Sequence, residues 1–192
     1  PSSSLLLFFG AFSFVYETSV AVANKKYWPT LRENSYLLGQ CTSADDAYLA
    51  LRGLRTMAVR LKQHEQAAIE VAKWLETHPL VDHIRHPAFA TCPGHEFFKR
   101  DFDGSNGLFS FVMKQGNQQA IDAFLDSLHH FKMGFSWGGY ESLVTANLSM
   151  KGLRSETGWS QGPVIRLHIG LEDVADLLAD LDQALAVYES HL

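Results

Sequence analysis

Val164-Ile165-Arg166-Leu167-His168-Ile169 is the stretch that best indicates how the chain folds. Alternation of side-chain character over a short segment is typical of a strand, because successive side chains of a strand point to opposite faces of its sheet. The two predicted faces are Ile165, Leu167 and Ile169 on one side and Val164, Arg166 and His168 on the other. The first face is wholly apolar, so we expect helices to cover it.

Helical patterns flank this strand on both sides. A regular apolar stripe follows Asp173 to the end of the chain. A longer amphipathic pattern of about six turns, with Leu61 among its apolar positions, runs from Leu54 to Pro79. The order of strands and helices predicts an α/β fold of the α+β-like kind, with a small, mostly antiparallel sheet covered by helices on one face and entered by the long helix. Further helices are expected at 27–39, 43–51, 95–102 and 117–128, and strands at 81–86, 108–113 and 130–135. Ser43, with Asp46 three positions on, and Asn117 are expected to cap the helices that they begin.

The first residues differ in character from the rest. Leu5 to Val15 is an almost unbroken apolar run, too short to span a bilayer as a helix, and no Lys or Arg precedes Lys25, as a signal peptide would require. We expect a buried strand or part of a core, in a chain cut from something longer. The predicted division is an atypical segment at 1–22 and one domain at 23–192.

Charge and cysteine content exclude several classes of function. The 192-residue chain has 16 basic and 21 acidic side chains, a formal charge of −5, and no basic cluster that could neutralise a row of phosphates, so we expect no nucleic-acid partner. Nothing in the sequence indicates a membrane partner. Two cysteines, Cys41 and Cys92, are too few for a disulfide framework and fit a reducing compartment. The expected location is cytoplasmic.

A glycine-rich motif and one arginine are the candidate ligand-binding features. Phe135 to Ser142 reads Phe-Ser-Trp-Gly-Gly-Tyr-Glu-Ser, in which paired glycines allow close approach to a ligand and Trp137 offers a flat wall. The same residues could form a plain turn with a core Trp. Arg166, in mid-strand, needs an anionic partner if it is buried, and the residues alone allow either a structural salt bridge or a clamp for a ligand carboxylate.

Histidines and a cysteine in the middle of the chain could suggest a metal site. His83, His86, Cys92 and His95 have ligand-like spacings, but two residues three apart on a strand point to opposite faces, so we predict no metal site. We expect His64 and the pair 129–130 at the surface or its boundary. No nucleophile-base arrangement or phosphate-cradling loop can be assigned, and no catalytic residue is proposed.

Several blocks, in the same order, resemble the C-terminal part of the Cys/Met-metabolism family of fold type I, pyridoxal-phosphate-dependent enzymes. The resemblance runs from about Val22 to the C-terminus. It depends most on a Ser-x-Gly-Gly-x-Glu-Ser motif and on an arginine strand followed by Gly-x-Glu-Asp. The blocks are Leu31–Asn34, Leu51–Thr56, Gly94–Phe97, Lys99–Phe102, Ser136–Ser142 and Ile165–Asp173.

The resemblance implies a substrate site and a reaction. Arg166 would bind the α-carboxylate of a sulfur-containing amino acid, helped by the backbone around Ser136, while Trp137 would wall the pocket near the departing thiol. Trp at 137 favours the carbon-sulfur β-lyase branch, which converts cystathionine into homocysteine, pyruvate and ammonia in methionine biosynthesis. A γ-lyase or γ-synthase is the alternative within the family. Pyridoxal 5'-phosphate would be the cofactor, and relatives are usually homotetramers.

One departure from the family bears on activity. The cofactor lysine would lie shortly before the region matched by Val20 to Asn24, yet residues 1–20 contain no lysine, and Lys25 and Lys26 align beyond that point. We therefore expect no covalent cofactor binding and no activity by this chain alone. Its expected partners are a homo-oligomer or a complementing N-terminal half, and a non-catalytic interaction or assembly domain is the second hypothesis. Phe135 also departs from the Tyr of the nearest relatives.

Overall fold

The computed structural model describes the backbone of residues 7–9 and 18–20 and the whole of residues 24–40, 42–149 and 162–192. The chain forms two compact units, residues 1–58 and residues 59–192, and each is described by itself. The predicted division after residue 22 stays a prediction. Among the described residues, no helix combines the length and the apolar character needed to cross a membrane.

The first unit contains a two-stranded antiparallel pair and two helices. Strand β1 (Leu7–Phe9) pairs with β2 (Thr18–Val20), and helices α1 (Trp28–Leu37) and α2 (Ala44–Leu54) follow. The remainder of the apolar run at 5–15 lies outside the described residues. Ser43 caps α2 as its sequence predicts, because its hydroxyl accepts the Asp46 amide at 3.1 Å. The predicted stop at residue 51 is three residues too early, since Gly53 lies within α2.

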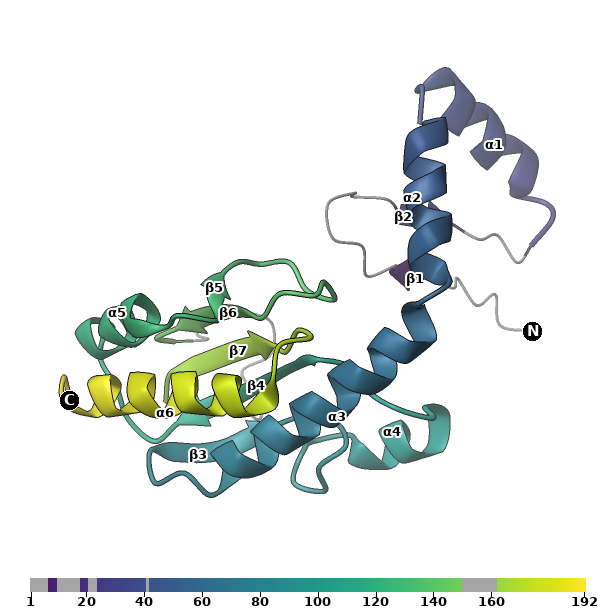
Figure 1. The fold of residues 1–192 in the computed structure, drawn as a ribbon. Helices are drawn as coiled ribbons and strands as arrows, with labels where there is room; N and C mark the ends of the chain where they lie inside the picture. The colour runs from purple at the N-terminus through teal and green to yellow at the C-terminus, as the bar shows by residue number, and fades with distance from the viewer. Residues whose placement is uncertain (1–6, 10–17, 21–23, 41, 150–161) are drawn as a thin grey trace. The chain divides into compact units, whose positions relative to one another are not determined.

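A five-stranded sheet with the order β3-β4-β7-β6-β5 forms the centre of the second unit (Figure 1). All pairs are antiparallel except β5 with β6. The bounds are Val81–Arg85 for β3, Leu108–Met113 for β4, Lys132–Met133 for β5, Leu143–Asn147 for β6 and Val164–His168 for β7. The small, mostly antiparallel sheet is thus confirmed, but the sequence did not predict β6, and β5 is shorter than the strand expected at 130–135.

Three helices build a single core against one face of the sheet. In Figure 1, α3 (Met57–Glu76) and α6 (Val174–Glu189) cross the same face, and α5 (Gln118–Ser127) packs against α6. The short helix α4 (His95–Asp101) has no buried residue. The helices cover the apolar face expected from β7, because the core joins their buried side chains to Phe109, Phe111, Val144, Ile165, Leu167 and Ile169.

The buried face of α3 differs from the stripe that its sequence indicates. Leu61 was expected on the apolar face but is exposed, whereas His64 was expected near the surface and is only 2% exposed. The expectation for His64 is therefore wrong. Its Nδ1 lies 2.8 Å from the carbonyl oxygen of Ile169, a residue far away in the sequence, whereas its Nε2 is buried and has no hydrogen-bond partner among the described residues.

The other face of the sheet carries the polar side chains of β7. The strand register places Arg166 directly opposite Ser110 on β4 and Thr145 on β6, and places Ser110 opposite Arg85 on β3. These four side chains share one row across the sheet, because directly paired residues point to the same face. None of the four is fully buried. This face, rather than the helix-covered one, can meet a ligand.

Candidate functional site

Arg166 lies in the middle of β7 and contacts the backbone of the loop that joins β5 to β6. Its Nη2 donates to the carbonyl oxygens of Phe135 at 2.9 Å and Gly134 at 3.2 Å. Its Nε is buried and has no hydrogen-bond partner among the described residues, and no carboxylate there forms an ion pair with it. Burial holds the pKa of this guanidinium below its usual value.

His168, two residues further along the same face of β7, holds the middle of the loop. Its Nε2 lies 3.0 Å from the carbonyl oxygen of Gly139, which can only accept, so Nε2 carries the ring proton. The Gly138 amide lies 3.0 Å from Nε2 and 3.3 Å from Nδ1, and therefore lies over the ring rather than in line with the lone pair of Nδ1. Burial lowers the pKa of His168, although the hydrogen bond to Gly139 opposes the shift.

Glu172 holds the far end of the loop through Ser142. The Ser142 amide donates to Oε1 of Glu172 at 2.7 Å, and the Ser142 hydroxyl donates to Oε2 at 2.8 Å. The same hydroxyl accepts the amide of Gly170 at 2.9 Å. In addition, the Leu171 amide donates to the carbonyl oxygen of Tyr140 at 2.8 Å. The motif Ser-x-Gly-Gly-x-Glu-Ser is therefore fastened to the segment that follows β7.

The other predicted site residues lie on this loop. Ser136 is exposed, Trp137 is half-buried, and Phe135 is 86% exposed. Gly138 has φ of +84°, a conformation that side-chain-bearing residues rarely adopt, so the first glycine of the pair is required by the turn itself. The structure thus brings the backbone beside Ser136 and Trp137 to Arg166 through the contact at Phe135. The roles assigned to these three residues remain predictions.

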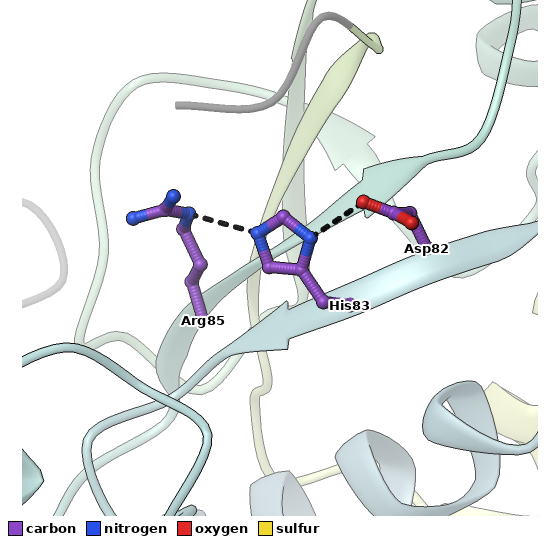
Figure 2. Close-up of polar contacts among 3 residues, drawn as sticks. All are labelled: Asp82, His83 and Arg85. Atoms are coloured by element: carbon purple, nitrogen blue, oxygen red, sulfur yellow. Dashed lines mark hydrogen bonds and ion pairs between the residues drawn. The ribbon is translucent and has the colours of Figure 1, made fainter. Parts of the chain in front are cut away.

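His83 and His86, two of the four residues considered as metal ligands, have separate surroundings. Figure 2 shows His83 between Asp82 and Arg85, with its Nδ1 2.8 Å from the Asp82 carboxylate and its Nε2 accepting Arg85 Nε at 3.2 Å. His86 is buried beside Phe109, with ring centroids 5.7 Å apart. No cluster of three or more His, Cys, Asp or Glu able to hold a metal is found in the described part of the chain.

The described lysines do not fit the family's covalent cofactor. A Schiff-base lysine reacts as the free amine, a form that desolvation or neighbouring charge favours. All seven described lysines are exposed, and the one nearest the loop in sequence, Lys132, donates its ammonium to the carbonyl oxygen of His129 at 2.7 Å. Lys151 lies outside the described residues. These residues give no basis for a reaction step through the cofactor.

Sequence reasoning found Arg166 and the loop but missed the residues that connect them. His168 was placed on the same strand face as Arg166, which was the signal available for it. No pattern in the sequence indicated that the Ser142 hydroxyl would meet Glu172, because the two residues lie in different connecting segments and the contact depends on the register of β6 with β7.

Comparisons with known proteins agree on one family. The model of the Cys/Met metabolism PLP-dependent enzymes matches residues 15–186. The chain is 52% identical to a cystathionine beta-lyase of Escherichia coli (strain K12) over 171 residues, 86% of this chain and 43% of that protein. It is 40% identical to the cystathionine gamma-lyase of Sus scrofa, over 77% of this chain and 38% of that protein.

A solved structure has the same fold. The chain superposes on a cystathionine gamma synthase of Xanthomonas oryzae pv. oryzae, in complex with cystathionine, with a TM-score of 0.78 and 35% identity. The match covers 90% of this chain and 46% of that one. The chain therefore spans less than half the length of the relatives it matches.

Proposed function

Because the chain belongs to the Cys/Met metabolism family of pyridoxal-phosphate-dependent enzymes, we propose that it supplies the substrate-carboxylate site of a carbon-sulfur β-lyase. In this proposal Arg166 binds the α-carboxylate of an amino-acid substrate, and the loop around Ser136 and Trp137 forms the adjoining wall. The whole enzyme would split cystathionine into homocysteine, pyruvate and ammonia.

The unpaired guanidinium of Arg166 carries the proposal. A half-buried cation is costly unless an anion compensates it, and within the described residues its partners are two neutral carbonyl oxygens. A carboxylate offers the two oxygens that a guanidinium binds in parallel, which is the geometry in which Arg is superior to Lys. A ligand carboxylate would also provide an acceptor close to the buried Nε.

Trp137 supports the β-lyase branch over the γ-acting alternatives. Its half-buried indole lies on the same loop as the carbonyl groups that Arg166 contacts, so a bound amino acid would have a flat apolar wall beside it. A thioether side chain is apolar and polarisable and suits such a wall. Such a wall would suit a β- or a γ-acting enzyme alike, so the β-lyase assignment rests on the resemblance that Trp at 137 carries, and the carboxylate site rests on Arg166.

Ligand titration of the 192-residue chain tests the carboxylate site. We expect R166K to weaken the binding of cystathionine roughly tenfold and R166A to weaken it by about a hundredfold, because one and then both parallel hydrogen bonds are lost. R100K is the matched control, since Arg100 is exposed and pairs with Asp101 on α4. Equal affinities for wild type, R166K and R166A, measured by calorimetry, would contradict the proposed site.

We also propose that this chain alone does not bind pyridoxal phosphate covalently. The exposed lysines and the absence of lysine from residues 1–24 support this. The chain would be incubated with pyridoxal phosphate, reduced with borohydride and digested for mass spectrometry. We expect only low, scattered labelling of surface lysines. Stoichiometric labelling at a single lysine would overturn the proposal without affecting the carboxylate site.

The second candidate function is an assembly domain, and the first unit favours it. Tyr36, Leu37, Leu38 and Tyr48 are large apolar side chains on or next to α1 and α2, and each is more than 60% exposed. Exposed apolar surface of this extent is typical of protein interfaces. Sedimentation velocity over a range of concentrations tests this function, for which we expect reversible self-association. A monomer at all concentrations would exclude a homo-oligomer of this chain.

A further inference from the structure

Three side chains from one short segment hold three successive points of the loop between β5 and β6. Arg166 contacts the loop at Phe135, His168 contacts it at Gly138 and Gly139, and Glu172 contacts it at Ser142. The first contact belongs to the proposed carboxylate site, and the third fixes the C-terminal end of the loop. The imidazole therefore holds the two glycines that directly follow Trp137.

The ring of His168 has little freedom to move. It is 2% exposed, and a Cβ atom on Gly107 would lie 3.1 Å from both its Cε1 and its Nδ1 and 2.4 Å from the carbonyl oxygen of Ile169. On another side lies the ring of His64, with the ring centroids 5.3 Å apart. A side chain fixed in this way is a rigid template for the backbone that it bonds.

We propose that His168 is a positioning residue, whose neutral imidazole fixes the Gly138–Gly139 turn and thereby sets where the backbone of Ser136 and the indole of Trp137 meet a ligand at Arg166. The ring contacts both residues of the turn, since its Nε2 donates to the carbonyl oxygen of Gly139 and the Gly138 amide lies over the ring, 3.0 Å from Nε2 and 3.3 Å from Nδ1. The functional part of this inference rests on the carboxylate site proposed above.

The effect of protonation distinguishes this positioning role of the neutral imidazole from a purely structural role of the side chain. A proton on Nδ1 makes the ring a cation, which disfavours the Gly138 amide N–H that lies over it, so the turn loses one of its two contacts. The charged groups around the ring act in both directions. His64 on α3 and Arg166 on β7 disfavour the imidazolium, whereas Glu172 after β7 favours it. Because burial dominates, the pKa of His168 lies below the usual value for histidine, and the turn should be intact at pH 7.

The test is an NMR titration of the ¹⁵N-labelled 192-residue chain without ligand. Ring correlations should show His168 with its proton on Nε2 at pH 7. On acidification, the amide signals of Gly138 and Gly139 should move with the same midpoint as the His168 ring, below pH 6.5. Loop amides that do not follow the ring through its titration would overturn the proposal. This measurement needs no substitution, so it does not depend on the folding of a variant.

Two variants give the complementary measurement at neutral pH. In H168N the turn should shift and its acid titration should disappear. His86 provides the matched control, since it is also buried with a pKa lowered by burial, but it packs between Phe89 and Phe109, away from the loop. H86N should leave the loop amides and their titration unchanged. Unchanged loop signals in a folded H168N would contradict the inference.

Measuring cystathionine binding tests whether the turn affects the proposed carboxylate site. H168N should weaken cystathionine binding about tenfold while Arg166 is intact, as expected for one buried hydrogen-bonding partner. If the Arg166 variants do not alter binding, the carboxylate site fails while the loop titration still tests the positioning role. If binding depends on Arg166 but not on His168, the site stands and the positioning role fails.

Discussion

Asp180 is a buried carboxylate on α6 that fastens the turn between α5 and β5. It is 4% exposed, and it accepts the amides of His129 at 2.9 Å, His130 at 2.8 Å and Phe131 at 3.3 Å, together with the side-chain amide of Gln183 at 3.1 Å. Desolvation acts to raise the pKa of Asp180, but these four donors together outweigh it and lower the pKa.

This arrangement predicts a pH-dependent contribution to stability. A carboxyl group with a depressed pKa in the folded state stabilises the protein above its unfolded pKa of about 4, and the contribution is lost as the pH falls through the folded value. D180N should lower the free energy of unfolding by about 2 to 4 kcal/mol at pH 7, and by less in acid.

Urea unfolding at a series of pH values measures this difference. D182N is the control, because Asp182 lies on the same helix but is exposed. If D180N lowers the free energy of unfolding by the same amount at pH 7 and below pH 3, the result would contradict a role for the charge of Asp180.

Ser142 presents a second prediction at the scale of a single residue. In S142A the buried amide of Gly170 loses its acceptor and Glu172 loses one donor, so the free energy of unfolding should fall by about 1 to 3 kcal/mol. S190A should change it by less than about 0.5 kcal/mol, because Ser190 is exposed at the end of α6. Chemical unfolding at neutral pH measures the free energy of unfolding of both variants. If S142A loses no more than S190A, the Ser142 contacts are not stabilising.

The sequence predicted the position of Arg166 but not its partners. Alternation along β7 fixed which face it occupies, whereas the choice between a salt bridge and a carboxylate clamp depended on which residues the register brings near. In the described residues those are Gly134 and Phe135. For His64 even the position was predicted wrongly. Its place in the core depends on contacts with carbonyl groups far away in the sequence, which local patterns do not indicate.

At the scale of one element, α5 depends in two ways on its N-cap residue, Asn117, which directly precedes it. The side-chain oxygen of Asn117 accepts the Ala120 amide at 2.8 Å, and its nitrogen donates to the carbonyl oxygen of His191 at 3.0 Å. N117D keeps the cap and loses the second contact, whereas N117A loses both. We expect N117A to cost about 1 to 2 kcal/mol and N117D less than half of that.

Thermal or urea unfolding of the two Asn117 variants separates the cap from the tie to the C-terminus. Equal losses in N117A and N117D would assign the whole effect to the contact with His191. A loss in N117A alone would assign it to the cap.

Elements with strong local signals were predicted well, and elements defined by pairing were not. Local sequence patterns determine some features, so the sequence indicates them directly. These are the helix caps at Ser43 and Asn117 and the strand at 108–113. Strand β6 was missed because Val144 is its only buried residue and its identity as a strand comes from pairing with β7.

At the scale of the whole molecule, the two units differ in how their helices are stabilised. No residue of α1 or α2 is buried, whereas α3, α5 and α6 share a core. Short helices without a buried face are marginal in water, because tertiary packing provides most helical stability. Amides of α1 and α2 should therefore exchange with deuterium at least about tenfold faster than those of α6.

Hydrogen exchange with mass spectrometry measures this difference, and α6 serves as the internal reference. Equal protection of α1, α2 and α6 in dilute solution would contradict it. Protection of α1 and α2 that rises with protein concentration would agree with self-association through the first unit.

The three contacts between the loop and the segment 166–172 also limit how this protein can be redesigned. Transplanting residues 134–142 alone into a related scaffold would bring the glycine turn without the imidazole and carboxylate that shape it. An engineer who wishes to exchange substrate preference between homologues should move residues 134–142 and 166–172 together, as one cassette made of two separate pieces of chain.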